Sequence, residues 1–141
     1  MAKPLKPELI YLDTSAMIAL LARDDPEHGR AVSFFREAVS GGSRFVLGRP
    51  TLMEFLNGVS KHVGKDVALE QYRLYTSSKF IFIERETEGD WERAWELFFK
   101  YTDKKGLDMI DALALAMMER LKIRKAFTFD SDFTVLFETV P

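Results

Sequence analysis

The chain contains no cysteine and only two histidines among its 141 residues. Without cysteine there is no disulfide framework, no thiol nucleophile and no thiolate-bound zinc, and two histidines are too few for an imidazole-based zinc site. No apolar run approaches the roughly 20 residues of a membrane span, and the opening segment MAKPLKP leads into no signal-peptide core. We therefore expect a cytoplasmic protein with no membrane partner.

The chain also lacks an excess of positive charge. It carries 20 lysines and arginines against 22 aspartates and glutamates, and its isoelectric point is about 5.7. A protein that holds nucleic acid by neutralising phosphates usually has a basic face, often with an isoelectric point above about 9. This charge disfavours tight non-specific DNA binding as the main function, whereas it is compatible with a hydrolase that touches nucleic acid only briefly.

The residues that are present indicate one globular domain. Apolar residues make up 47% of the chain, and phenylalanine alone occurs 12 times. A chain of this length normally forms a single domain and buries about 68–70% of its unfolded surface without help from disulfides. We expect a loose leader over residues 1–8, which is polar and rich in proline, followed by a single domain over residues 9–141.

Short apolar runs alternate with helical patterns along the whole domain. The predicted strands are 9–12, 44–47, 80–83 and 125–128, with a short fifth at 137–140, and the predicted helices are 16–22, a segment ending at 41–42, 51–63, 66–77, 90–102 and 109–121. The strands are almost free of polar residues, which is typical of a parallel sheet covered on both faces. The pattern predicts an α/β fold whose central parallel sheet has four to five strands.

Most of the carboxylates fit a solvent-exposed surface. Glu84, Glu86, Glu88 and Asp90 form an acidic stretch before a helix, which we interpret as solvated. Four other acids interrupt apolar segments or follow them directly, and these are Asp13, Glu54, Asp111 and Asp130. Each lies just after a strand or in the first turns of a helix. Because strand ends and helix starts meet at one edge of a parallel sheet, we expect the four to converge.

Each of these acids also has a purely structural interpretation. In it, Asp13 caps a helix, Asp111 forms a capping box with Asp108, Glu54 pairs with Arg49 or Lys61, and Asp130 and Asp132 cap a helical turn. Convergence would be costly, since two carboxylates about 4 Å apart repel by roughly 4 kcal/mol at an effective dielectric near 20. A hard cation such as Mg²⁺ or Mn²⁺, which prefers carboxylate oxygen, removes that cost.

Four motifs resemble a PIN domain and, within that group, a VapC-type toxin ribonuclease. They are IYLDTSA at residues 10–16, LMEF at 52–55, MIDALALA at 109–116 and TFDSDF at 128–133. The resemblance covers residues 9–133 in order and spacing. It implies a three-layer α/β/α fold and an acidic cluster that binds Mg²⁺ or Mn²⁺.

The resemblance also implies hydrolysis of an RNA phosphodiester. By position, Asp13, Asp111 and Asp130 match the acids that hold the metal, and Glu54 matches the acid that orients or deprotonates the attacking water. Asp108 falls where the family more often has serine or threonine, and Asp132 is close enough in sequence to substitute for Asp130. Whether Asp108 or Asp132 joins the acidic site stays open, as does the choice between Mg²⁺ and Mn²⁺.

The implied partners are an RNA substrate, a cognate antitoxin and a second copy of the chain in a homodimer. Two alternatives stay open, namely a PIN-like nuclease that processes RNA outside a toxin–antitoxin system, and a non-catalytic α/β binding module whose acids cap helices. A receiver-type signalling domain is disfavoured because the first strand ends in one acid rather than a pair. A phosphatase of the Asp-x-Asp type is disfavoured because residue 15 is serine.

Overall fold

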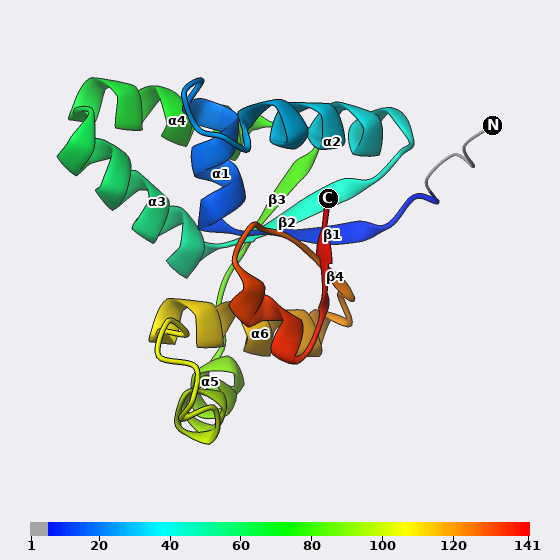
Figure 1. Ribbon diagram of the computed structural model, residues 1–141, viewed down its shortest axis with the longest axis vertical. Coiled ribbons are helices and arrows are strands. Elements are labelled where there is room, and N and C mark those ends of the chain that lie inside the picture. Colours follow the sequence, from blue (N-terminus) through cyan, green and yellow to red (C-terminus); the bar gives the residue numbers. More distant parts are fainter. Residues whose placement is uncertain (1–5) are drawn as a thin grey trace.

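The computed structural model describes residues 6–141, which form a five-stranded sheet surrounded by helices (Figure 1). In chain order the elements are β1 (Leu9–Leu12), α1 (Thr14–Leu21), α2 (His28–Ser40), β2 (Arg44–Gly48), α3 (Arg49–His62), α4 (Lys65–Ser77), β3 (Ile81–Glu84), α5 (Glu88–Lys100), α6 (Met109–Leu121), β4 (Lys125–Phe127), the 3-10 helix η1 (Ser131–Val135) and β5 (Glu138–Val140). Every predicted strand and helix is present, with ends that move by one or two residues.

All pairs in the sheet are parallel, and the strand order is β3-β2-β1-β4-β5. The first strand, β1, lies at the centre, where Ile10 is beside Phe45 of β2 and Lys125 of β4. Strands β1 and β4 are adjacent although more than 100 residues separate them in sequence. This arrangement places the carboxyl ends of β1 and β4 side by side, directly before the starts of α1 and η1.

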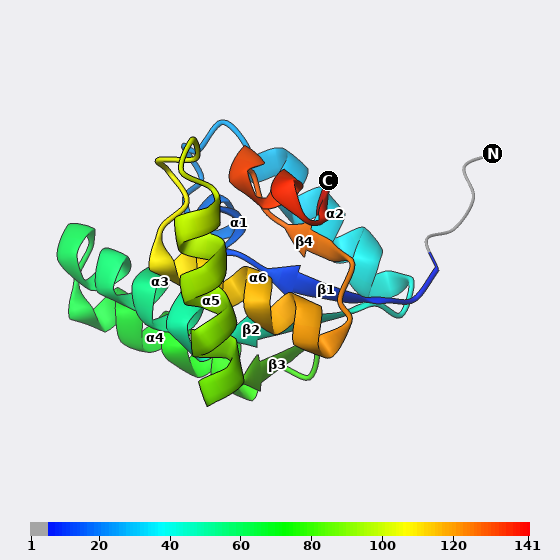
Figure 2. The ribbon, with the colours of Figure 1, turned by 90° about the horizontal axis from the view of Figure 1, so that it is seen from below.

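Helices cover both faces of the sheet, which confirms the three-layer α/β/α prediction. Figures 1 and 2 show α1–α4 on one face and α5, α6 and η1 on the other. Alternation along β1 divides the core accordingly: Ile10 and Leu12 pack towards α1–α4, whereas Tyr11 packs towards α6. The apolar strand runs follow from this double burial, because a strand covered on both faces has no side that water reaches.

Gly48 permits a close approach at the junction of β2 and α3. A side chain at this position would collide with the Tyr11 hydroxyl and with the thioether of Met117. The Tyr11 hydroxyl instead lies 2.9 Å from the Thr51 hydroxyl in the first turn of α3. Because Gly48 has no Cβ, Tyr11 of β1 and Met117 of α6 can pack directly against the start of α3. This contact positions the helix that carries Glu54.

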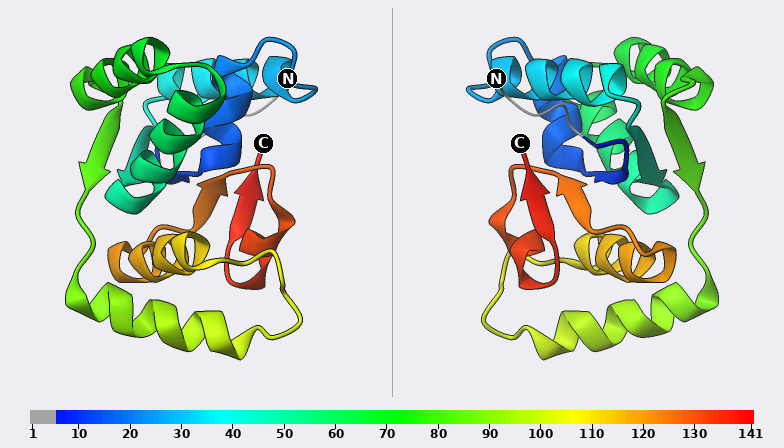
Figure 3. Two further views of the ribbon diagram at one scale, coloured as in Figure 1. Left: turned by 90° about the vertical axis from the view of Figure 1, so that its left-hand side faces the viewer. Right: turned by 90° about the vertical axis from the view of Figure 1, so that its right-hand side faces the viewer.

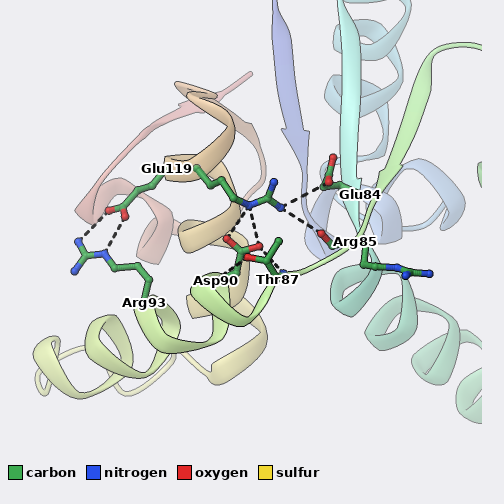
Figure 4. Close-up of polar contacts among 7 residues, drawn as sticks. Glu84, Arg85, Thr87, Asp90, Arg93 and Glu119 are labelled. Atoms are coloured by element: carbon green, nitrogen blue, oxygen red, sulfur yellow. Dashed lines mark hydrogen bonds and ion pairs between the residues drawn. The ribbon is translucent and has the colours of Figure 1, made fainter.

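Helix α5 is joined to α6 by two arginine–carboxylate pairs, drawn in Figure 4. Arg120 Nε donates to both oxygens of buried Asp90, at 3.0 and 3.1 Å, and Arg93 donates to both oxygens of Glu119, at 2.8 and 3.0 Å. Asp90 also forms a capping box with Thr87. The prediction of a solvated surface acid was wrong for Asp90, because its partner lies 30 residues away and leaves no local signal.

The predicted leader over residues 1–8 lies mostly outside the described residues. Its last residue, Glu8, is bound to the sheet rather than loose: its carboxylate accepts from Lys125 Nζ at 2.9 Å, and its backbone N–H donates to Ser43 Oγ at 3.2 Å. None of the helices described within residues 6–141 combines the length and apolar character needed to cross a bilayer.

Candidate functional site

Asp13 lies between the end of β1 and the start of α1 and is held by hydroxyl groups. Its Oδ2 accepts from Thr128 Oγ1 at 2.7 Å, from Ser15 Oγ at 2.9 Å and from the Ser15 N–H at 3.3 Å. The last bond is a helix cap, so the capping interpretation of Asp13 is confirmed. Burial raises the pKa of this carboxyl, and the bonds from Thr128 and Ser15 offset part of the rise.

Ser15 and Thr128 connect Asp13 to the segment after β4. Their hydroxyl oxygens lie 3.0 Å apart, the Phe129 N–H donates to Ser15 Oγ at 2.9 Å, and the Asp130 N–H donates to Thr128 Oγ1 at 3.0 Å. Asp130 in turn caps η1 through a 2.9 Å bond from the Asp132 N–H to its Oδ1. The two strand ends therefore form one hydrogen-bonded unit that fixes both acids.

Asp111 lies in the first turn of α6 and is buried. The predicted capping box is confirmed: the Asp111 N–H donates to Asp108 Oδ1 at 2.9 Å, and the Asp108 N–H donates to Asp111 Oδ2 at 3.1 Å. Burial, together with the nearby charges of Asp108, Asp13 and Asp130, raises the pKa of Asp111 to about 8. The Asp111 side chain therefore takes part in the capping box and also lies close to the other acids.

Glu54 lies near the middle of α3 and faces α1. Its Oε1 accepts from Thr14 Oγ1 at 2.7 Å. Burial raises the pKa of Glu54, and the charges of Asp108 and Asp13 act in the same direction. The alternative pairing with Arg49 or Lys61 was wrong, because Arg49 forms its ion pair with Glu86, at 3.9 Å, and Lys61 makes no ion pair within the described chain.

The sequence left open whether Asp108 or Asp132 belongs to the acidic site. Asp108 raises the pKa of both Asp111 and Glu54, so it lies among the acids. Asp132 is different, since its Oδ2 occupies the space where a side chain on Gly106 would lie, and its charge is not among the causes of the shifts at Asp13, Glu54 or Asp111. Asp132 thus faces the loop before α6.

The structure therefore brings Asp13, Asp108, Asp111 and Asp130 within reach of one another's charge, with Glu54 beside them through Thr14. In residues 6–141, no basic side chain forms an ion pair with any of these acids. Nor do any three His, Cys, Asp or Glu side chains of that part of the chain lie close enough to form a complete ligand set as they stand. The donors are all carboxylate and hydroxyl oxygens, the set that suits a hard divalent cation.

Sequence reasoning missed the roles of Thr14 and Thr51. Thr14 lies between Asp13 and the predicted helix over residues 16–22, and in the structure it is the first residue of α1, where its hydroxyl reaches Glu54 across 40 residues. The position next to a candidate acid was the only available signal. The contact between Thr51 and Tyr11 depends on the packing of β1 against α3, which a linear pattern does not encode.

An apolar groove of about 430 Å³ opens beside Glu54 and Thr14. Its walls come from α1, α3 and the start of α4, and they include Ile18, Phe55 and Val63. Both Ile18 and Val63 are exposed. Among the candidate acids, Glu54 is the one that lines this open, largely apolar groove.

Comparisons with known proteins identify the family and relatives of the fold. The PIN-domain family model matches residues 10–136. Among curated proteins, the chain is 31% identical over 128 residues to the 23S rRNA-specific endonuclease VapC20 of Mycobacterium tuberculosis, an alignment that covers 89% of this chain and 92% of that protein. The crystal structure of VapC20, a sarcin–ricin loop cleaving toxin, superposes with a TM-score of 0.81 at 25% identity and covers 94% of this chain and 99% of its own.

More distant structures share the fold. VapBC2 from Rickettsia felis, bound to a promoter DNA fragment, superposes with a TM-score of 0.69 at 16% identity and covers 94% of this chain and 99% of its own. FitAcB from Neisseria gonorrhoeae superposes with a TM-score of 0.64 at 17% identity and covers 94% and 96%.

Proposed function

This chain belongs to the PIN-domain family of metal-dependent nucleases, and from that premise we propose that it is an endoribonuclease and the toxin of a toxin–antitoxin pair. One observation carries the proposal most directly. Buried Asp13 and Asp111 and half-buried Asp130 lie within reach of one another's charge, without any basic partner among the described residues. Such an arrangement costs stability unless a cation is bound.

We assign Asp13, Asp111 and Asp130 to the metal, and either Mg²⁺ or Mn²⁺ fits their oxygen donors. The bound cation supplies Lewis acidity and offsets negative charge on the phosphate. Ser15 and Thr128 hold Asp13 in orientation through the 2.9 and 2.7 Å bonds to Oδ2. Because Asp108 occupies one oxygen of the Asp111 carboxylate with its N–H, the other oxygen is free for the site.

Glu54 orients the attacking water and accepts its proton. Its raised pKa makes it a better base than an ordinary glutamate, and the bond from Thr14 fixes the direction of the carboxylate. Attack of this water on phosphorus breaks one P–O bond of the backbone, and the leaving oxygen takes a proton from solvent. The products are a phosphate monoester and a free hydroxyl.

The sarcin–ricin loop of 23S rRNA is the first substrate to test, since VapC20 cleaves that loop and covers most of this chain at 31% identity. The antitoxin partner is supported by the toxin–antitoxin complexes among the structural neighbours. An antitoxin segment in the groove would lie directly against Glu54 and Thr14. We further propose a homodimer that acts in the cytoplasm, where its RNA substrate is found.

Cleavage of RNA by the purified full-length chain tests the proposal. The substrates are a 23S rRNA fragment that carries the sarcin–ricin loop and a fragment without it, each with Mg²⁺, Mn²⁺ or EDTA. We expect cutting with either metal, none with EDTA, and a loss of more than about 100-fold in Asp13→Asn, because even residues behind metal ligands typically contribute about 10–100-fold.

The matched control is Asp66→Asn, the same substitution in the first turn of α4, away from the acids. This variant should cut at the wild-type rate. Equal loss in both variants, or cutting that persists in EDTA, contradicts the proposed chemistry. Metal-dependent cutting of both RNA fragments alike supports the nuclease but overturns the sarcin–ricin assignment.

A further inference from the structure

Two hydrogen bonds join the end of β1 and the start of α1 to the first turns of α3. The Tyr11 hydroxyl lies 2.9 Å from the Thr51 hydroxyl, and the Thr14 hydroxyl donates to Glu54 Oε1 at 2.7 Å. Each pair spans 40 residues, so the two bonds have the same offset along both segments. Asp13 lies between Tyr11 and Thr14 in sequence. The two bonds therefore hold the segment that carries Asp13 against the helix that carries Glu54.

The Tyr11–Thr51 pair is the more deeply buried of these two bonds. Tyr11 and Thr51 are 0% and 1% exposed, whereas Thr14 and Glu54 are only partly buried. A buried hydrogen bond keeps its geometry because water does not compete for its donor and acceptor. The Tyr11–Thr51 pair therefore fixes where α3 begins, and Thr14 then directs the Glu54 carboxylate.

The Tyr11 hydroxyl also lies beside a third element. It and the Met117 thioether of α6 both occupy the space that a Cβ on Gly48, the residue before α3, would need. Figure 3 shows α1 and α3 on one side of the sheet and α6 on the other. Burial raises the pKa of Tyr11, and the charges of Asp13 and Asp111 add to the rise. One hydroxyl therefore lies where β1, α3 and α6, which carry three of the candidate acids, meet.

We propose that the Tyr11–Thr51 pair is a positioning device, which sets the place of Glu54 relative to Asp13 and to the metal held there. The proposal rests on the proposed ribonuclease function. Thr51 lies three residues before Glu54, so the two are neighbours along α3, and a shift of the helix at Thr51 also moves Glu54. A base must lie within about 2.6–3.2 Å of the water that it deprotonates, and a displacement of about 1 Å can cost about 100-fold in rate. Tyr11 and Thr51 are too buried to touch RNA, so they act only through Glu54.

The choice of hydroxyl groups at this contact supports a role in orientation. Phenylalanine and valine have nearly the same shapes as Tyr11 and Thr51, and they carry no polar atom that must be satisfied after burial. A hydrophobic contact is not directional, whereas a hydrogen bond restricts both distance and angle. A buried hydroxyl pair therefore suits a position where the direction of α3 matters more than the burial of apolar area.

Tyr11→Phe in the full-length chain is the first test, because it removes one oxygen and keeps the ring. With the RNA that wild type cuts, kcat should fall by about tenfold, as is typical when a residue behind an active group is lost. KM should stay within about twofold of wild type, since Tyr11 does not bind substrate. The Mn²⁺ dissociation constant, measured by calorimetry, should stay within about threefold, because the proposed metal ligands are unchanged. Thr51→Val removes the other hydroxyl and should give the same result.

The matched control is Tyr75→Phe, the same substitution at a second buried tyrosine next to α3. Tyr75 is 3% exposed, and its ring meets the Phe55 ring of α3 edge-on with centroids 5.7 Å apart. Burial alone raises the pKa of Tyr75, so the substitution removes no hydrogen bond within the described chain. This variant should keep kcat within about twofold of wild type.

A double-mutant cycle tests whether Tyr11 acts through Glu54. Glu54→Gln alone should lower kcat by about 100-fold or more, because the proposed base is lost. Adding Tyr11→Phe should lower kcat by less than about twofold further, since no base is left to displace. Two losses that multiply overturn the action through Glu54.

Thermal unfolding separates orientation from stability. Tyr11→Phe and Thr51→Val should each lower the unfolding midpoint, because each leaves one buried hydroxyl without its partner. The double variant should recover most of the midpoint, yet its kcat should stay about tenfold below wild type. Recovery of kcat together with the midpoint means that the pair only holds the fold, and it overturns the proposal.

Hydrogen exchange gives a measurement that needs no cleavage. Tyr11→Phe should speed amide exchange in peptides that cover residues 49–55 by about tenfold, and Tyr75→Phe should leave it unchanged. A wild-type chain that cuts no RNA with either metal removes the proposed function, and unchanged exchange in Tyr11→Phe then also overturns the fixing of α3. Where wild type cuts, a Tyr11→Phe kcat within about twofold of wild type overturns the positioning device and leaves the ribonuclease in place.

Discussion

Helix α6 carries a group of carboxylates at each of its ends. At the amino-terminal end, Asp108 and Asp111 face Asp13 and Asp130, and the described chain provides no ion pair for any of them. At the carboxyl-terminal end, drawn in Figure 4, Glu119 binds Arg93 and the neighbouring Arg120 binds Asp90. One helix thus separates acids that have no basic partner within residues 6–141 from Asp90 and Glu119, each of which is bound by an arginine.

The consequences for protonation are opposite at the two ends. Burial and neighbouring charges raise the pKa of Asp111 to about 8. Burial also acts to raise the pKa of Asp90, but hydrogen bonds from Arg120 and Thr87 hold it below its ordinary value. The positive end of the helix dipole favours acids at the amino-terminal end, but that effect contributes only about 0.3–1 kcal/mol. We infer from this comparison that one group stabilises the fold, whereas the other is kept at a cost in stability for the proposed metal site.

Asp111→Asn gives the largest expected effect. RNA cleavage should fall by more than about 100-fold, because a proposed metal ligand is lost. The free energy of unfolding without divalent metal should rise by about 1–2 kcal/mol at pH 8. A raised folded-state pKa means that wild-type stability is fully present at low pH and is lost as pH rises through about 8, so the advantage of the variant grows over that range. Cleavage assays and urea unfolding at several pH values measure both effects.

Asp90→Asn is the control at the other end of α6. It keeps an oxygen for the capping box with Thr87 but removes the charge that Arg120 binds. Unfolding free energy should fall by about 2 kcal/mol while cleavage at saturating substrate is retained. If Asp111→Asn instead destabilises the chain as much as Asp90→Asn does, the two groups of acids do not differ in the proposed way.

The acids without cations were visible in the sequence because each breaks a local pattern. Asp13 ends an apolar strand, and Asp111 is the one charge in an otherwise apolar helix start. The arginine-bound acid was not visible, because Asp90 lies in an acidic stretch and Arg120 lies 30 residues later. A charged residue inside an apolar segment can be recognised from that segment alone. An ion pair between two segments can be recognised only when the packing of α5 on α6 is known.

The fold was predictable for the same reason. Uninterrupted apolar runs identified the parallel strands, since double burial leaves no polar side on β1 or β2. The strand order was not predictable, because β1 lies beside both β2 and β4 and only tertiary packing selects the second neighbour. Neither did the sequence show that Trp91 and Trp95 are exposed, since apolar residues at helical spacing fit a buried face equally well.

Arg120→Met should have the next largest effect, a loss of about 3 kcal/mol in unfolding free energy. The substitution leaves buried Asp90 as an unpaired charge, and removing one partner of a buried pair typically costs about 3–5 kcal/mol. Because part of the Arg120 side chain is exposed, we expect a loss of unfolding free energy at the low end of this range. Adding Asp90→Asn should recover more than about 1 kcal/mol, since the unpaired charge is then gone. A double variant that is no more stable than Arg120→Met contradicts this.

Acid pH should narrow the difference between wild type and Arg120→Met. The pKa of Asp90 is lowered in the folded wild type, so its contribution is present above the ordinary carboxyl pKa and is lost as pH falls through the lower folded value. In the variant, burial without Arg120 raises that pKa, and protonation at low pH then relieves the unpaired charge. Thermal unfolding between pH 7 and pH 3 should therefore show the two curves converging. Parallel curves would assign the loss to packing rather than charge.

Arg93→Met should have the smallest effect, a loss of about 0.5–1 kcal/mol. Arg93 donates to both oxygens of Glu119 with distances as short as those of the Arg120–Asp90 pair, and it also reaches Glu96 at 3.0 Å. The bonds differ mainly in solvent access, because Arg93 and Glu119 are each about one-third exposed whereas Asp90 is buried. Water already solvates much of an exposed pair, so its loss costs little and 0.5 M salt should reduce the cost further. A cost equal to that of Arg120→Met would mean that the number of hydrogen bonds, rather than burial, determines how α5 is held to α6.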